Sequence, residues 1–192
     1  MENVDRGVYL SYNRIMSEKT TNNKIITVLR ILLPIACVLW LVFIFRNSLQ
    51  TGEQSSAQSA TIVDTVQKVA QAIAPESKIA NATGKSYDIL HVFIRGFAHF
   101  VEFAILGALF CWCYFVYTLQ LKRLYLPILG IILVPVIDEY MQGFVAGRGS
   151  EWLDLAVDIG GGLAGGLFAA VCVLIGLMIR EKRLRAIKTE NI

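Results

Sequence analysis

The chain has 192 residues and a formal net charge of +3; 55% of the residues are hydrophobic and only 17% are charged. Soluble domains have about a quarter of their residues charged, so this composition excludes a soluble globular enzyme. The small positive charge also gives no reason to expect a nucleic-acid partner. The apolar residues lie in long blocks, which predict an integral membrane protein whose first partner is the lipid bilayer.

Residues 1–24 form a polar segment, and the first apolar block follows at residues 25–45. The polar segment is longer than the basic region of a cleavable signal peptide, so this block is expected to remain as a membrane-spanning helix. Three further blocks, at residues 97–119, 124–144 and 153–179, are also long enough to cross a hydrocarbon core of about 30 Å. The predicted fold class is therefore all-α, a polytopic bundle of four transmembrane helices that occupies residues 25–179. Prolines within or beside these blocks are interpreted as kinks rather than helix ends, at Pro34, Pro127 and Pro135.

The longest connection is the predicted loop from about residue 46 to residue 96. Its first part, residues 47–59, is rich in Ser and Gln and is expected to be solvated coil. Apolar residues then recur at helical spacing, at Ile62, Val66, Val69 and Ile73. This spacing predicts a short amphipathic helix that either lies on the outer membrane surface or packs over the mouth of the bundle.

Three ionisable residues on one stripe lie just before the second predicted span and in its first turns. Arg95, His99 and Glu102 fall within about 60° of each other around a helix. At this spacing the Glu102 carboxylate could orient His99 and raise its basicity, as for a general base or a supported metal ligand. Ionisable side chains at membrane depth are costly, which makes this stripe a candidate functional site.

The third predicted span ends with two adjacent acids, Asp138 and Glu139, and an amide, Gln142. Two acids placed together at low dielectric cannot both ionise cheaply unless a cation lies between them. Candidates for that cation are Arg95, Arg148, protonated His99 or a metal ion. The oxygen-rich residues do not identify a metal, so the sequence assigns no metal or other cofactor.

The fourth predicted span begins with Asp154 and Asp158, one helical turn apart. Gly161 and Gly165 follow on the same face and predict close packing against a neighbouring helix. The two carboxylates would then face the same crevice as the polar groups of the other spans.

Basic residues predict the orientation of the spans. Twelve of the 18 Lys and Arg residues precede or open the first span, lie between the second and third spans, or lie in the tail at residues 180–192. The positive-inside rule places these segments, and therefore both termini, in the cytoplasm. All the candidate site residues then fall near the outer face: Arg95, His99, Glu102, Asp138, Glu139, Gln142, Arg148, Asp154 and Asp158.

Three runs of residues resemble motifs of the VanZ-like family. They are residues 95–103 (RGFAHFVEF), residues 138–142 (DEYMQ), and the stretch from Arg148 through Asp154 to Asp158. The Ser- and Gln-rich segment after the first span is also similar to that family's segment at this place, so the resemblance extends over residues 35–177. It implies a small multi-pass protein of the bacterial cell membrane, from a family named after a member that confers low-level teicoplanin resistance.

The residues and the resemblance together suggest three hypotheses. In the first, the protein lowers the action of lipoglycopeptide antibiotics such as teicoplanin at the outer leaflet, by altering a lipid or cell-wall precursor or by occupying the drug's anchoring site. In the second, it is an intramembrane hydrolase or transferase with catalytic candidates His99, Glu102, Asp138 and Glu139, while Arg95 and Arg148 hold a phosphate group. Gln142, Asp154 and Asp158 are the remaining substrate-binding candidates. In the third, the polar stripe is a proton or ion relay, although the acids gather at one end of the spans.

Overall fold

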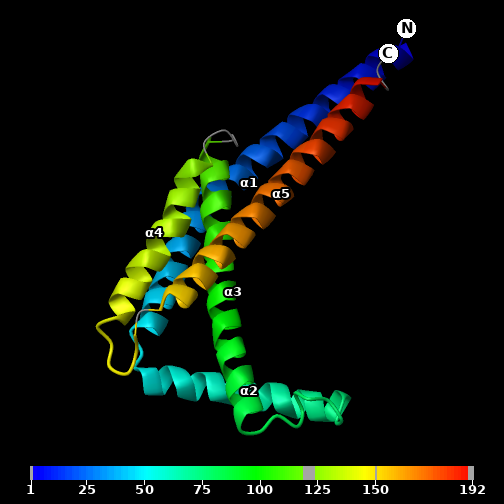
Figure 1. The fold of residues 1–192 in the computed structure, drawn as a ribbon. Helices are drawn as coiled ribbons and strands as arrows, with labels where there is room; N and C mark the ends of the chain where they lie inside the picture. The colour runs from blue at the N-terminus through cyan, green and yellow to red at the C-terminus, as the bar shows by residue number, and fades with distance from the viewer. Residues whose placement is uncertain (1, 119–123, 150, 190–192) are drawn as a thin grey trace.

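The structure is a computed structural model that describes residues 2–118, 124–149 and 151–189. Within these ranges the chain forms five helices and no strand, in agreement with the predicted all-α class. The helices are α1 (Glu2–Ser48), α2 (Gly52–Ile73), α3 (Lys85–Thr118), α4 (Tyr125–Gln142) and α5 (Trp152–Thr189) (Figure 1).

Four stretches of these helices are long and apolar enough to cross a membrane, as predicted. They are Lys24–Ser48, Lys85–Thr118, Tyr125–Gln142 and Trp152–Arg183. The main difference from the sequence prediction is α3, which begins at Lys85 rather than near residue 97. Its 34 residues give a length of about 51 Å, so several turns extend beyond a hydrocarbon core of about 30 Å.

The three prolines within or beside the apolar blocks do not end any helix, as predicted. Pro34 lies inside α1 and Pro135 lies inside α4. Pro127 lies in the first turn of α4, where its missing N–H costs no helical hydrogen bond.

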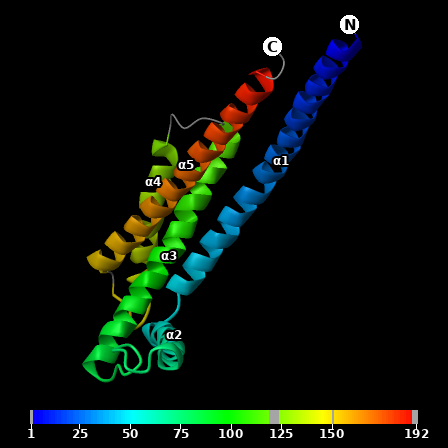
Figure 2. The ribbon, with the colours of Figure 1, turned by 90° about the vertical axis from the view of Figure 1, so that its right-hand side faces the viewer.

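Helices α1, α3, α4 and α5 form a bundle, and α2 crosses one end of it (Figures 1 and 2). We call this end the α2 end. The N-terminal part of α1 and the C-terminal part of α5 project from the opposite end, as an even number of membrane crossings requires.

The closest packing in the bundle is between α3 and α5, and glycines make it possible. A methyl group added to Gly161 would overlap the carbonyl oxygen of Phe100, and one added to Gly165 would overlap that of Ala104. Gly107 of α3 meets the backbone of Gly162 in the same way. The predicted role of Gly161 and Gly165 in close helix packing is therefore confirmed.

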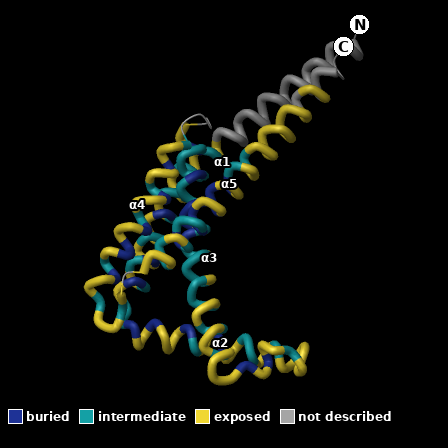
Figure 3. Tube along the Cα trace, in the orientation of Figure 1, coloured by how far each residue is buried: buried dark blue, intermediate teal, exposed yellow. Residues whose placement is uncertain are grey.

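The bundle has an apolar exterior and a partly polar interior. Large apolar side chains of α1 remain exposed, among them Ile31, Val38 and Leu39, as expected for a surface that faces lipid (Figure 3). A small apolar core of Ile44, Phe103 and Leu106 joins α1 to α3. Among the residues whose burial the structure describes, the buried polar and charged side chains are Ser48, Ser55, Ser59, Asp138, Glu139, Gln142 and Asp158.

The prediction of solvated coil for residues 47–59 was wrong, because α2 already begins at Gly52. Thr51 caps this helix: its Oγ1 accepts from the N–H of Gln54 at 3.3 Å, and the N–H of Thr51 donates to Gln54 Oε1 at 3.1 Å. This reciprocal pair is a capping box, which supplies the helix start that the polar composition concealed. Ser55 and Ser59 of the first turns are buried.

The amphipathic helix expected after residue 60 is thus the second half of α2. It ends at Ile73, just before Pro75, as predicted. Two placements were open for this segment, on the membrane surface or over the end of the bundle. The start of the segment packs over the end of the bundle, because Val63 is fully buried there. The expected apolar face remains exposed at Ile62 and Val69, and most of all at Ile73, which is 79% exposed.

Candidate functional site

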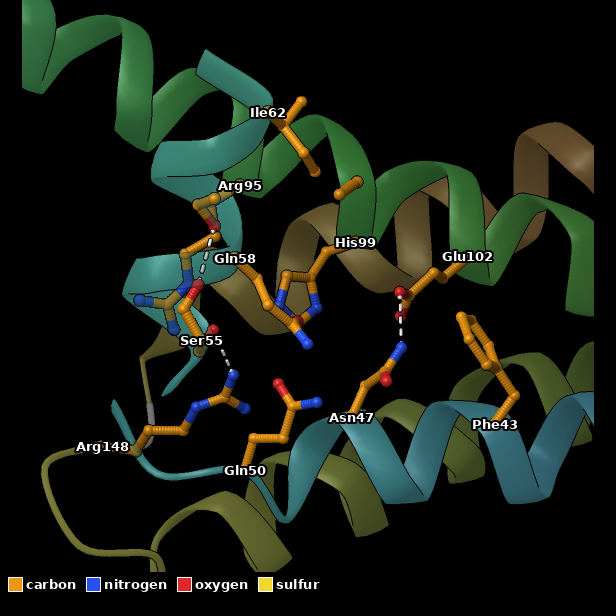
Figure 4. Close-up of a pocket in the computed structure, with 12 residues that line it drawn as sticks. Phe43, Asn47, Gln50, Ser55, Gln58, Ile62, Arg95, His99, Glu102 and Arg148 are labelled. Carbon is orange, nitrogen blue, oxygen red and sulfur yellow. Dashed lines mark hydrogen bonds between the residues drawn. The ribbon is translucent and has the colours of Figure 1, made fainter. Parts of the chain in front are cut away.

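A pocket of about 310 Å³ lies at the α2 end, enclosed by α1, α2, α3 and the connection between α4 and α5 (Figure 4). Four of the predicted site residues line it: Arg95, His99, Glu102 and Arg148. The other lining residues are Phe43, Asn47, Gln50, Ser55, Gln58, Ser59, Ile62 and Ala98. The remaining predicted residues do not line the pocket; they lie on α4 and α5.

Two acids of α5 face two basic residues of α3. His99 Nδ1 lies 3.5 Å from Asp158 Oδ1, and Arg95 Nη2 lies 3.9 Å from Asp154 Oδ2. The Asp158 side chain is completely buried, and the His99 side chain is 13% exposed. The carboxylate at ion-pair distance from His99 is therefore Asp158, whereas the stripe on α3 alone had suggested Glu102.

Glu102 is instead tied to α1. Asn47 Nδ2 donates to Glu102 Oε1 at 3.1 Å, and the indole N–H of Trp40 donates to the backbone carbonyl of Glu102 at 2.9 Å. These two bonds fix the position of α1 against α3 and hold the Glu102 carboxylate at the edge of the pocket (Figure 4).

Asp138 is fully buried and does not line the pocket. It receives its hydrogen bonds from neutral groups. Ser48 Oγ donates to Asp138 Oδ1 at 2.5 Å, and Gln142 Nε2 donates to Asp138 Oδ2 at 2.8 Å. These neutral donors take the place where the sequence had suggested a cation. Glu139 lies toward the connection that follows α4, where its Oε2 accepts from the N–H of Glu151 at 3.0 Å.

No group of three His, Cys, Asp or Glu side chains that could hold a metal ion occurs in the part of the chain that the structure describes.

Arg148 joins three segments that are far apart in the sequence. Its Nη1 donates to the carbonyl of Ser48 at 3.2 Å, and its Nη2 donates to Ser55 Oγ at 2.6 Å. Burial lowers the pKa of Arg148, and the nearby positive charge of Arg95 lowers it further. A guanidinium remains protonated despite such a shift, so Arg148 is a fixed positive charge beside the pocket.

Beside Arg148, the start of α2 is in direct backbone contact with the connection between α4 and α5. The N–H of Gly52 donates to the carbonyl of Ala146 at 3.1 Å. A methyl group on Gly52 would overlap the carbonyl oxygen of Gly147, which itself has a left-handed φ of 73°. Both glycines are therefore needed for this approach.

Sequence reasoning missed the contributions of α1 and α2 to the pocket. Asn47, Ser55, Gln58 and Ser59 line it, and Ser48 binds both Asp138 and Arg148. The capping box that begins at Thr51, together with small polar residues one turn apart, could have shown that this segment is helical and packed.

We expect leucine at Asp138 to lower the free energy of unfolding by about 1–3 kcal/mol, because the buried Ser48 hydroxyl and Gln142 amide lose their shared acceptor. Asparagine keeps one oxygen acceptor and should cost less. The measurement is thermal unfolding of the purified protein in detergent. Val136→Leu on the exposed face of α4 is the matched control, and equal stability of Asp138→Leu and this control would contradict the prediction.

Comparison with known proteins gives one finding. A family model described as VanZ/LLP1 matches residues 33–175, which include every residue that lines the pocket. No curated protein and no solved structure matches the sequence.

Proposed function

Because the chain belongs to the VanZ/LLP1 family of membrane proteins, we propose that it acts at the outer leaflet of the bacterial cell membrane and lowers susceptibility to teicoplanin or other lipoglycopeptide antibiotics. In this proposal its pocket binds the polar headgroup of a cell-envelope amphiphile, either a lipid-linked cell-wall precursor or the lipid that anchors the drug.

The orientation follows from the basic residues. Both ends of the chain and the connection between α3 and α4 carry the excess of Lys and Arg, which is typical of cytoplasmic segments. The α2 end then faces away from the cytoplasm, and the pocket is reached from the outer leaflet.

The observation that carries the proposal is that the pocket is lined by both charged and apolar side chains. Helix α4 has 18 residues and spans about 27 Å, so its end at Gln142 lies near one boundary of the hydrocarbon core. The pocket lies at the α2 end, and its lining combines polar side chains, such as Arg148 and Gln50, with the apolar side chains of Phe43 and Ile62. An amphiphile can place its headgroup against the polar side chains while its chain stays in the bilayer.

A second candidate function, an intramembrane hydrolase or transferase, is favoured by His99 and Asp158. Asp158 lies beside Nδ1 of His99, and His99 lines the pocket. A carboxylate at Nδ1 orients an imidazole so that Nε2 can accept a proton from water or a substrate hydroxyl. Both candidates use the same pocket, and the enzyme could be the means by which the resistance arises.

A relay across the membrane is less well supported. The described side chains that are buried and polar lie in α2 or in the halves of α1, α4 and α5 that approach the α2 end. A relay needs such groups along the whole path.

The test is teicoplanin susceptibility of a Gram-positive host that expresses the wild-type chain, His99→Gln or His91→Gln at matched membrane levels. His91 is a suitable control because it lies on the same helix and does not line the pocket, and because a glutamine amide can also reach the Ser56 carbonyl that His91 Nε2 contacts at 3.1 Å. We expect the wild type and His91→Gln to raise the inhibitory concentration and His99→Gln to return it to the level of the empty host. No increase with the wild type, or an equal increase with both variants, would overturn the proposal.

A further inference from the structure

The charges of the pocket are separated by sign. Arg95 and Arg148 lie at one end and Glu102 lies at the other, with His99 between them (Figure 4). Arg95 and Glu102 are seven residues apart on α3, which corresponds to about 10 Å along the helix axis. The pocket is therefore an electric dipole as well as a cavity.

The positive end has donors that the protein does not use. The Nε atoms of Arg95 and Arg148 are both buried without a hydrogen-bond partner. Arg148 binds a carbonyl and a hydroxyl, and none of the described carboxylates lies within ion-pair distance of it. Arg95 has one acidic neighbour, Asp154, at 3.9 Å.

Two guanidinium groups that share a pocket repel each other unless an anion lies between them. Their forked donors match the oxygens of a phosphate group, which can accept several hydrogen bonds at once. A phosphate at this end would also give the buried Nε atoms acceptors.

The negative end has the opposite character. Glu102 receives one hydrogen bond, from Asn47, and none of the described basic side chains lies within ion-pair distance of it. The side-chain oxygen of Asn47 is a further acceptor at this end, and the ring of Phe43 also lines the pocket here. Two kinds of oxygen acceptor beside an aromatic ring suit a primary ammonium group, which has three N–H donors.

We propose that the pocket binds a zwitterionic phosphate headgroup of the phosphoethanolamine type, with its phosphate between Arg95 and Arg148 and its ammonium group at Glu102. The inference rests on the proposed function, because it names the chemical class that the same pocket recognises. A headgroup with both charges complements both ends, whereas a purely anionic one leaves Glu102 without a cationic partner. A trimethylated ammonium has no N–H to donate to Glu102 or Asn47.

The test is native mass spectrometry of the full chain in detergent, with equal amounts of phosphatidylethanolamine, phosphatidylglycerol and phosphatidylcholine of identical acyl chains. We expect phosphatidylethanolamine to bind about tenfold more tightly than the other two, the effect of one charge-assisted hydrogen bond. Wild-type protein that binds the three lipids equally would overturn the inference.

Two variants test which end of the pocket binds the ammonium group and which binds the phosphate. Glu102→Gln should abolish the preference for phosphatidylethanolamine. Arg95→Gln should instead weaken the binding of all three phospholipids by a similar factor. Glu76→Gln, an exposed glutamate beyond α2, is the matched control and should leave the preference unchanged. A preference that survives Glu102→Gln would also overturn the inference.

Soluble phosphoethanolamine distinguishes the two sources of this headgroup. If it displaces the bound lipid, the headgroup alone is recognised; if it does not and the preference remains sensitive to Glu102→Gln, the ligand is the intact lipid. Either result supports the inference. If the protein selects phosphatidylethanolamine but has no effect on teicoplanin susceptibility, only the proposed role in drug susceptibility is rejected. If it affects teicoplanin susceptibility but does not select among the lipids, only this inference is rejected.

Discussion

Alanine at Gly165 is expected to remove most of the folded protein from the membrane. Its methyl carbon would overlap the carbonyl oxygen of Ala104, which belongs to the rigid backbone of α3 and cannot turn aside. Helices α3 and α5 would have to separate, and with them the pairs Arg95–Asp154 and His99–Asp158. Overpacking of a tight interior costs about 1–3 kcal/mol even where side chains can shift, so a backbone collision should reach or exceed the top of this range.

The measurement is the yield of monodisperse protein after detergent extraction, together with its thermal unfolding temperature. Gly160→Ala is the matched control, because a methyl group at this neighbouring position on α5 meets nothing within 4 Å. Alanine is the better helix former, so this control should be neutral or slightly stabilising. If Gly165→Ala and Gly160→Ala behave alike, the close contact between α3 and α5 is refuted.

Alanine at Gly52 is expected to detach the start of α2 while leaving the four-helix bundle intact. The added methyl group would overlap the carbonyl oxygen of Gly147 and break the bond from the Gly52 N–H to Ala146. Arg148 would then lose its position beside Ser55. Because four residues of α2 line the pocket, the proposed headgroup binding should weaken together with the order of this helix.

Hydrogen–deuterium exchange of the purified protein measures this directly. Amide exchange should become faster across Gly52–Ile73 and stay unchanged in the helices of the bundle. Gly149→Ala in the same connection is the control, since an added methyl group there meets nothing within 4 Å. Unchanged exchange of α2 in Gly52→Ala would contradict the backbone contact on which this prediction depends.

The four spans could be predicted from the sequence because long apolar blocks have few alternatives in a bilayer. The extent of α3 could not, because residues 85–96 mix apolar and polar side chains and lie beyond the most hydrophobic window. The start of α2 was missed for a related reason: small polar residues resemble coil by composition. Their helical state depends on the cap at Thr51 and on contacts with the bundle.

In the candidate site, too, relations within one helix could be predicted and relations between helices could not. Helical periodicity placed Arg95, His99 and Glu102 on one stripe and predicted that Gly165 packs against a neighbouring helix, since these relations are local to one helix. The pairing of His99 with Asp158 depends on how α3 and α5 rotate against each other, which no single helix encodes. The role of Ser48 likewise depends on distant segments, because its hydrogen-bond partners are Asp138 on α4 and Arg148.

The hydrogen bonds of Ser48 also determine when during biogenesis this end of the protein can be completed. Its partner Asp138 is synthesised 90 residues later, and Arg148 follows 100 residues after it. Insertion of an unpaired aspartate into a membrane costs up to about 2.5–3.5 kcal/mol, the value at the centre of a helix, and less toward the helix end where Asp138 lies. The third crossing is therefore stabilised by a first crossing that is already in the membrane. The opening helix can therefore act as a docking partner for the later crossings, and the set of residues that lines the pocket is complete only once Arg148 has been synthesised.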